Sequence, residues 1–434
     1  MTSVPSEEIR FHPASFCDRN GRVFFWRGEL YRALTADGAA LCRRMFAEGI
    51  IDRLVGAKLL VETEMTELAI DGFEAVVKHR RLPFVSLANE WSPRMVRDAG
   101  LLVANLELAL RREGLGLDDN DADLGNVLFD GCQPIYVDLG SIVDAGSLGD
   151  RRYREFETRC LFPAQLFATG QAKLGRALLQ PQNDAALAEL AAAAFDPRQR
   201  QSLSVSLRRI LAPLLPMASV ANAPSDRIAQ LKAVLEQQTM PPMAEAEQSG
   251  DPSEGAVSAL LKQLGPKTAM AIGRDAARFL PLLVAAGCQT VFVDLDDRVV
   301  DREYSSLCEQ SDSVLPLVLD LRYPTPGFGV CNREVPPASE RLACDLVLAA
   351  DIAKPLVFER YLNLDQVASG LALFSKRWLA IDYRTPAPNQ IDHWQKRFPW
   401  YTAENLLAAL RGVFRSVTKY HEQGPGRLTF LCEK

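Results

Sequence analysis

The second half of the chain carries a series of short, continuously apolar runs separated by helical stretches, and this pattern constrains the fold more than any other. The runs lie at 268–273, 290–296, 315–321, 344–351, 377–383 and 427–434. Continuous apolar strands that alternate with helices indicate a parallel sheet covered on both faces. The second half is therefore predicted to be a doubly wound α/β domain.

Four of these runs carry an aspartate at or near the carboxyl end of their apolar stretch: Asp294, Asp320, Asp351 and Asp382. The carboxyl ends of parallel strands meet at one edge of a sheet, and open α/β sheets bind their ligands in the crevice at that edge. Each aspartate alone could equally cap the helix that follows it. Four aspartates in corresponding positions favour a ligand site at this edge.

The first half of the chain has a different pattern of apolar residues. Together with a polar stretch in the middle, this pattern divides the protein into four predicted parts. Short strand-like runs at 22–26, 29–33, 73–77, 127–129 and 134–137 flank helical stretches near 38–56 and 92–113. We predict an α+β region over 1–150 and a helical extension over 151–237. A linker rich in Pro, Gly, Ser and acidic residues follows over 238–256, and the α/β domain occupies 257–434.

Composition excludes several classes of protein. The formal net charge of the 434 residues is −6, so no basic surface for nucleic acid is expected. No apolar run is long enough to cross a membrane, and the polar start is unlike a signal peptide, which predicts a cytoplasmic protein. Nine cysteines without a C-x-x-C pair and only four histidines predict reduced, buried thiols and no metal site.

Several short motifs together resemble a bacterial two-part family, in which a kinase-like region is fused to a class I S-adenosylmethionine (SAM)-dependent methyltransferase domain. The motifs are EWSPRMVRDAG (90–100), NDADLGNVLF (120–129), PIYVDLGSI (134–142), YREFETRCLFP (153–163), DLRYPTP (320–326), CDLVLAAD (344–351), FPWYTAENL (398–406) and GRLTFLC (426–432). The resemblance implies a kinase-like α+β amino-terminal region and a Rossmann-like methyltransferase-type domain.

In the kinase-like part, the resemblance implies a pocket built by Asp121, Asn126 and Asp138. These residues match the catalytic Asp and Asn and the D-x-G metal ligand of kinases. Lys78 is the candidate strand lysine, and Glu90 its candidate partner. No Gly-rich phosphate loop precedes them, so a scaffold or a small-ligand pocket is favoured over phosphotransfer. The run KHRR (78–81) could bind an anion or an acidic carrier protein, or form a solvated turn.

In the methyltransferase-like part, the cofactor loop departs from the family pattern. The first strand and loop should read acidic-x-Gly-x-x-x-Gly, and here only Gly273 remains, with Ala271 and Ala277 at the other two positions. Asp294 is retained where such enzymes hold the ribose hydroxyls. Arg278 is expected to fill space beside the cofactor. We therefore expect no cofactor, or weak binding of SAM.

Cations replace glycine and histidine around this edge, and they predict a site for a zwitterionic or anionic small molecule. The expected catalytic residues are Asp382, Asp351 and Lys354. The expected substrate-binding residues are Arg274, Arg278, Asp294 and Arg384. The alternative is that these are solvated surface charges.

Three functions follow as hypotheses. The first is a natural-product tailoring enzyme that has lost methyl transfer and closes a ring, for example an aziridine, by expelling sulfate or phosphate. The second is a SAM-dependent methyltransferase with an atypical cofactor loop, and the third is a non-catalytic scaffold or partner subunit. A small-molecule substrate, free or on an acidic carrier protein, is the expected partner. A small partner subunit is a further candidate, and nucleic acid and membrane are not expected partners.

Overall fold

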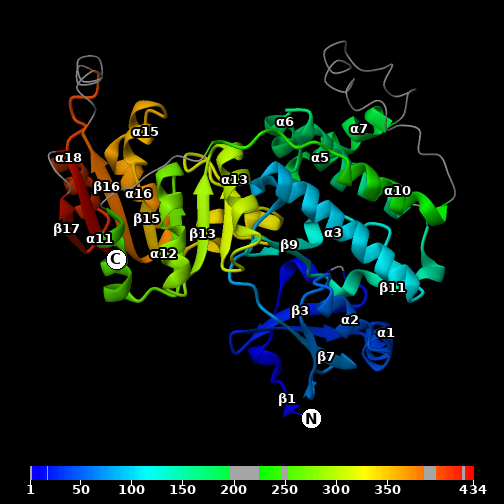
Figure 1. The fold of residues 1–434 in the computed structure, drawn as a ribbon. Helices are drawn as coiled ribbons and strands as arrows, with labels where there is room; N and C mark the ends of the chain where they lie inside the picture. Colours follow the sequence, from blue (N-terminus) through cyan, green and yellow to red (C-terminus); the bar gives the residue numbers. More distant parts are fainter. Residues whose placement is uncertain are drawn as a thin grey trace.

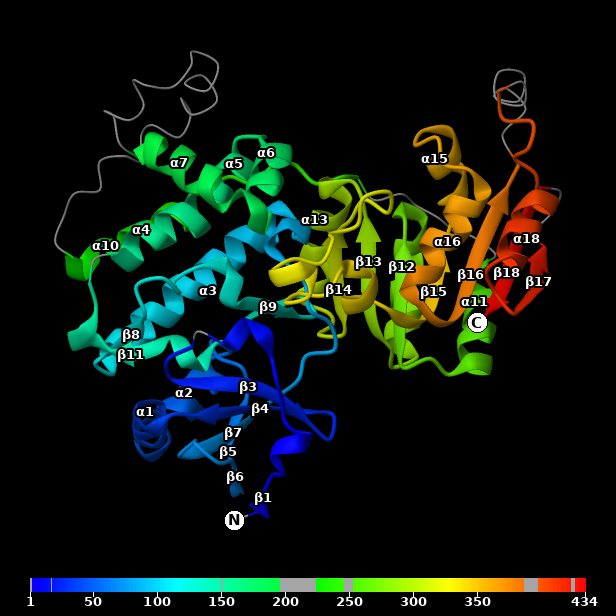
Figure 2. The same ribbon diagram turned by 180° about the vertical axis from the view of Figure 1, so that it is seen from behind.

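The computed structural model describes residues 2–16, 18–149, 151–195, 224–245, 253–385, 397–422 and 426–434. The amino-terminal region and the helical extension lie together, and the α/β domain lies beside them (Figure 1). The view from behind shows the same division, with the first sheet below the extension (Figure 2).

The amino-terminal region is built on a five-stranded antiparallel sheet of order β2-β3-β4-β7-β5. The strands are β2 (Arg10–Phe11), β3 (Gly21–Trp26), β4 (Glu29–Leu34), β5 (Thr63–Met65) and β7 (Ala75–His79). Helices α1 (Ala36–Ala47) and α2 (Ile50–Gly56) connect β4 to β5, and β1 (Thr2–Ser3) pairs with β6 (Leu68–Ala69). The run predicted at 73–77 forms a strand two residues later.

Helix α3 (Pro93–Arg112) joins this sheet to two small β ladders. Pro93 stands at its first turn, where a missing N–H costs nothing, and its last turn carries two arginines. Apolar side chains recur at helical spacing and are buried: Met95, Val96, Ala99, Leu102, Val103, Leu106 and Leu110. The ladders pair β8 (Leu115–Leu117) with β11 (Ile142–Asp144), and β9 (Val127–Asp130) with β10 (Gln133–Tyr136).

The described part of the extension is helical. It comprises α4 (Arg151–Phe156), a π-helical turn (Glu157–Leu161), α5 (Phe162–Ala168), α6 (Ala172–Leu178), α7 (Asp184–Phe195) and α10 (Pro224–Glu236). Helix α10 packs along α3, where Leu235 approaches Gly100. The extension therefore shares its core with the amino-terminal region.

The second half forms a seven-stranded sheet of order β14-β13-β12-β15-β16-β18-β17. The strands are β12 (Thr268–Ile272), β13 (Gln289–Asp294), β14 (Val314–Val318), β15 (Cys344–Ala349), β16 (Ser375–Arg384), β17 (Ser416–Glu422) and β18 (Arg427–Glu433). Numbered within the domain the order is 3-2-1-4-5-7-6, with the seventh strand antiparallel to its neighbours. This is the arrangement of a Rossmann-like methyltransferase fold.

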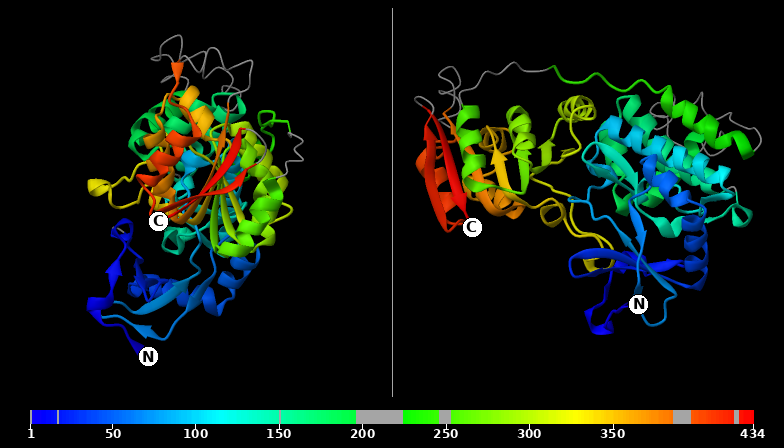
Figure 3. Two further views of the ribbon diagram at one scale, coloured as in Figure 1. Left: turned by 90° about the vertical axis from the view of Figure 1, so that its left-hand side faces the viewer. Right: turned by 60° about the horizontal axis from the view of Figure 1, so that its bottom comes forward.

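Two features of this sheet differ from the prediction of a parallel sheet. Strand β18 runs antiparallel because β17, which the sequence pattern did not indicate, returns directly into it. Half of β17 is solvent-exposed, so it lacks the continuous apolar pattern that marked the other strands. Both strands lie at the end of the molecule opposite the amino-terminal half (Figure 3).

Helices cover both faces of this sheet. They are α11 (Ser253–Leu264), α12 (Leu280–Ala285), α13 (Asp297–Leu307), α14 (Ala338–Arg341), α15 (Ala353–Phe358), α16 (Leu364–Phe374) and α18 (Ala403–Arg411). Helix α11 begins inside the range predicted as a linker. Met240 is buried and the backbone N–H of Ala244 donates to the carbonyl of Arg298, so the described start of that range packs against α13. Residues 246–252 of the predicted linker lie outside the described residues.

A buried ion pair joins the two halves. Arg341 Nη2 lies 2.6 Å from Glu90 Oε1, and both side chains are almost completely buried. Arg176 of α6 donates to the carbonyl oxygens of Asn89 and Trp91 at 2.8 Å each. The expected partner of Glu90, Lys78, is instead 3.1 Å from Glu29 on the exposed side of the first sheet. The predicted Lys78–Glu90 pair is therefore wrong.

Candidate functional site

A cavity of about 560 Å³ opens at the carboxyl edge of the second sheet. The loops after β12, β13, β14 and β15 line it on one side and α15 on the other. Six carboxylates and two guanidiniums of the described residues face it: Asp275, Asp294, Asp296, Asp320, Asp351, Glu359, Arg274 and Arg360. This is the edge at which open α/β sheets bind ligands.

Gly273 makes the turn after β12, at the start of the first loop that lines the cavity. Its φ is +94°, a conformation that favours glycine, and a Cβ at this position would lie 3.2 Å from the carbonyl oxygen of Ala350. The chain then continues as a short 3₁₀ turn, Arg274–Phe279. Gly273 is therefore required by backbone geometry and by the close approach of the β15 loop.

Asp351 follows β15 and has the most constrained position in the cavity. Its φ of +51° lies in the left-handed region, which a non-glycine residue adopts at an energetic cost. Arg384 Nη1 lies 2.8 Å from its Oδ2, and its buried Oδ1 has no hydrogen-bond partner among the described residues. Burial raises the pKa of Asp351, and Arg384 partly opposes this.

Asp294 ends β13 and is partly buried. Its Oδ1 accepts a hydrogen bond of 2.8 Å from the backbone N–H of Asp296, and burial raises its pKa. Asp296 contacts Arg274 at 3.2 Å and Arg298 at 2.9 Å. The hydrogen bond from Arg298 lowers the pKa of Asp296. One wall of the cavity thus combines a partly buried carboxyl group with an ion-paired one.

Four of the predicted residues do not line this cavity: Arg278, Lys354, Asp382 and Arg384. Arg278 turns the other way, 3.4 Å from Ser253 Oγ of α11 and against the ring of Phe279. Lys354 lies in the first turn of α15, from which its charge lowers the pKa of Asp351. Asp382 lies two residues before the end of β16, because that strand is longer than its apolar run.

Asp382 belongs to a separate environment. It accepts hydrogen bonds from Thr429 at 2.6 Å and from Arg427 at 3.1 Å, and it borders a small cavity of about 30 Å³ below α11. Its carboxylate is 8% exposed. The predicted seven-residue site is thus divided: Arg274, Asp294 and Asp351 share one cavity, and Arg384 contacts that cavity through Asp351.

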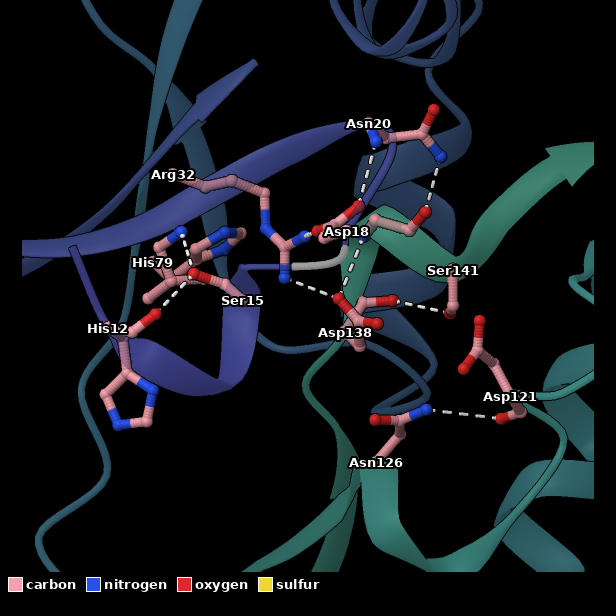
Figure 4. A network of polar contacts seen from close by, with 12 residues as sticks. His12, Ser15, Asp18, Asn20, Arg32, His79, Asp121, Asn126, Asp138 and Ser141 are labelled. Atoms are coloured by element: carbon pink, nitrogen blue, oxygen red, sulfur yellow. Dashed lines mark hydrogen bonds and ion pairs between the residues drawn. The ribbon is translucent and has the colours of Figure 1, made fainter. Parts of the chain in front are cut away.

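The amino-terminal half holds a second acidic cluster, drawn in Figure 4. Arg32 of β4 is 4% exposed and donates to the carboxylates of both Asp18 and Asp138. Asn20 donates to the carbonyl of Gly140 at 2.5 Å. These contacts tie the first sheet to the loop after β10, so the cation that faces the D-x-G aspartate is Arg32 and not Lys78.

Asp121 and Asn126 lie beside this ion-paired group. Asn126 donates to the backbone carbonyl of Asp121 at 3.3 Å, so the predicted pair is in contact through the main chain. Burial and then the nearby carboxylates, Asp138 first, raise the pKa of Asp121 to about 7. Burial raises the pKa of Asp123 to about 6.

The basic run 78–81 does not form one cationic surface. Lys78 pairs with Glu29, His79 is buried against Thr63 at 2.9 Å, and Arg80 contacts Asp130. Arg81 donates to the carbonyl of Gly28. Lys78 and His79 alternate across strand β7, and Arg80 and Arg81 follow the strand with separate partners, so the charges do not gather.

Sequence reasoning missed Arg32, Arg341 and the cavity residues Asp296, Glu359 and Arg360. Arg32 stands within an apolar strand (ELYRAL), and a charge at a buried strand position was the available signal. The described residues hold no group of three or more His, Cys, Asp or Glu side chains that could bind a metal ion. In the same part of the chain, no helix is long and apolar enough to span a membrane.

Comparisons with known proteins give one full-length relative. The nodulation protein NoeA of Rhizobium meliloti (strain 1021) is 25% identical, over 97% of this chain and 95% of its own length. No protein-family model matches the chain.

Among solved structures, the N-methyltransferase NodS from Bradyrhizobium japonicum WM9 is 15% identical, with a TM-score of 0.30, over 43% of this chain and 99% of its own. Magnesium protoporphyrin IX methyltransferase from Synechocystis PCC 6803 is 12% identical, with a TM-score of 0.29, over 44% of this chain and 90% of its own. The strand order and connections of the second sheet themselves define its Rossmann-like fold.

Proposed function

We propose that the protein is a methyltransferase that binds SAM in the cavity at the carboxyl edge of the second sheet. The observation that carries this proposal is the excess of carboxylates in that cavity, six against two guanidiniums among the described residues. An acidic cavity favours a cationic ligand. When bound, SAM supplies an electrophilic methyl group on a positively charged sulfur.

The electrostatics do not favour the ring-closing hypothesis. A departing sulfate or phosphate needs cations that face it, yet Arg278 and Lys354 do not line the cavity. Arg274 lines it beside Asp296, 3.2 Å away. An anionic group would therefore enter a cavity whose net charge repels it.

The residues present fit the nucleoside part of SAM. Asp294 can accept hydrogen bonds from ribose hydroxyls at the end of β13, as carboxylates do in related dinucleotide-binding folds. Gly273 keeps the start of the cavity wall free of a side chain. Arg278 contacts Ser253 and does not line the cavity, which supports space for a bound SAM.

Asp351 is the proposed general base. It lines the cavity, and its raised pKa makes it a better proton acceptor than an ordinary carboxylate. Arg384 fixes the carboxylate through Oδ2. In this role Asp351 accepts the proton of an amine or hydroxyl on a small-molecule acceptor as that group becomes the nucleophile.

We further propose that residues 1–150 form a kinase-like scaffold that does not transfer phosphate. The order of the first sheet and the Asp121, Asn126 and Asp138 constellation support the kinase likeness. Arg32 is the cation that faces this constellation, and it already binds the carboxylates of Asp18 and Asp138. Its charge is therefore neutralised and is not available for a phosphate.

Titration calorimetry with SAM and with S-adenosylhomocysteine tests the methyltransferase proposal. We expect a dissociation constant below about 100 μM, equivalent to roughly −5.5 kcal/mol, and at least tenfold weaker binding for Asp294→Asn. Asp365→Asn is the matched control, because Asp365 is exposed on α16 and lies outside the cavity. Unchanged binding by Asp294→Asn, or no binding by the parent, would contradict the proposal and favour a scaffold.

A further inference from the structure

The tip of the β9–β10 hairpin presses against the α/β domain. Gly131 at this tip has a φ of +58°, and a Cβ there would clash with the carbonyl of Asp312. The next residue, Cys132, is 5% exposed. Its Sγ lies 3.5 Å from the carbonyl oxygen of Val314. A thiol of the amino-terminal region is therefore held within the boundary between the two halves.

A second thiol, from the other half, lies against the first. Cys308 caps the carboxyl end of α13, and its Sγ is 3.9 Å from the carbonyl oxygen of Cys132. The side chain of Cys308 is also the first cause of the raised pKa of Cys132. Cys132 is buried, whereas Cys308 is exposed to solvent. One partner of the pair can therefore be reached by a dissolved reagent.

We propose that Cys132 and Cys308 are a reversible oxidation site, at which a disulfide bond covalently joins the amino-terminal region to the α/β domain. The two residues are 176 positions apart in sequence, so the bond would close a long loop. Helix α13, which carries Cys308, begins next to the cavity residue Asp296, so the bond anchors an element that leads into the crevice.

The surroundings assign different roles to the two thiols. The hydrogen bond from Cys132 lowers the pKa of Cys308, with a smaller contribution from Tyr304, whereas burial and then the charges of Asp98 and Glu309 oppose it. The same hydrogen bond, together with burial and the charge of Asp312, raises the pKa of Cys132. Because thiolates are the nucleophiles in disulfide exchange, Cys308 is the thiol that reacts first.

The chemistry balances with a low-molecular-weight disulfide as oxidant. The Cys308 thiolate attacks one sulfur of glutathione disulfide, forming a mixed disulfide and releasing one glutathione thiolate. The Cys132 sulfur then attacks Cys308 Sγ, forming the Cys132–Cys308 bond and releasing the second glutathione. Two protein thiols are oxidised and one glutathione disulfide is reduced to two thiols, with the protons passing to the leaving thiolates.

Incubation of the full chain with glutathione disulfide, followed by non-reducing peptide mass spectrometry, tests this proposal. We expect a Cys132–Cys308 peptide that dithiothreitol removes, and a melting temperature raised by roughly 5 °C or more. Cys308→Ser should abolish both changes. Cys331→Ser is the matched control, because Cys331 is also exposed but lies in the loop after β14, and it should behave like the parent.

Two results would overturn the proposal. The first is oxidation of the parent that stops at a glutathione adduct on Cys308 without the cross-linked peptide. The second is the same rise in melting temperature for Cys308→Ser as for the parent. Because exposed Cys308 is the residue replaced, the variant is expected to fold, and its unoxidised melting temperature verifies this.

Discussion

The two acidic clusters of this protein have similar composition but opposite organisation. In the amino-terminal half, Arg32 is buried between Asp18 and Asp138, and its two terminal nitrogens form ion pairs with their carboxylates. In the α/β domain, carboxylates border a cavity of about 560 Å³, and Asp351 keeps one buried oxygen without a described hydrogen-bond partner. The first arrangement holds structure together, and the second places carboxylate residues around a space where a ligand can bind.

This difference explains why motif matching alone misleads here. Asp121, Asn126 and Asp138 match a kinase pattern well, yet a neighbouring cation neutralises part of the group. The methyltransferase-like loop matches its pattern poorly, yet it borders the larger cavity. What decides the chemistry is which atoms are already paired, and that can be tested in both clusters.

The largest expected effect is on the stability of the paired cluster. Arg32→Met leaves Asp18 and Asp138 partly buried beside each other without their cation, which should cost about 3–5 kcal/mol of unfolding free energy. Denaturant unfolding measures this. Arg274→Met is the matched control in the crevice, where the arginine side chain is 43% exposed and the expected loss is at most about 1 kcal/mol. Equal midpoints for the two variants would remove the contrast between the clusters.

The next effect is on catalysis in the crevice. Asp351→Asn should lower the methyl-transfer rate about 100-fold or more, since it removes the proposed base, while the melting temperature stays nearly constant. Asp382→Asn should show the reverse, because it weakens the contacts with Thr429 and Arg427 and leaves the cavity lining intact. Radiolabelled methyl transfer and thermal unfolding distinguish the two. Comparable rate losses in both variants would place Asp382 back in the site.

A smaller effect is expected from pH. In the folded protein the pKa of Asp121 is raised to about 7 and that of Asp123 to about 6, above the ordinary value near 4 of the unfolded chain. The folded state therefore holds protons that the unfolded state has lost, and stability falls as pH rises from 5 to 8. Chemical unfolding across this range measures the slope, and Asp121→Asn should make it shallower. A slope that Asp121→Asn leaves unchanged would assign the effect to other groups.

The smallest effect is expected for the lysine that sequence patterns associated with the kinase-like pocket. Lys78→Met should leave the melting temperature unchanged, because its pair with Glu29 is at the surface. Addition of magnesium and ATP should not shift the melting temperature of the parent or of Lys78→Met. A nucleotide-dependent shift in the parent that Lys78→Met abolishes would restore the phosphotransfer hypothesis.

Local sequence patterns predicted most of the elements that build the second sheet. Five of its strands and β18 formed within a few residues of their apolar runs, because a fully buried strand must be apolar along its length. The exposed strand β17 was not predicted, and its absence from the pattern also concealed the antiparallel direction of β18. In the first half, the strands β3 and β4 and the helix α3 formed where alternation and helical spacing indicated them.

The sequence by itself determined which segments become strands and helices, and it placed aspartates at the ends of β13 and β15. Tertiary structure decided which charges meet. Arg32 and Asp138 are 106 positions apart, and Glu90 and Arg341 are 251 apart. Arg278 turned away from a cavity that its neighbour Arg274 lines. Hydrophobic periodicity is a local property and can be read along the chain, whereas the pairing of charged side chains depends on distances that exist only once distant segments have packed together.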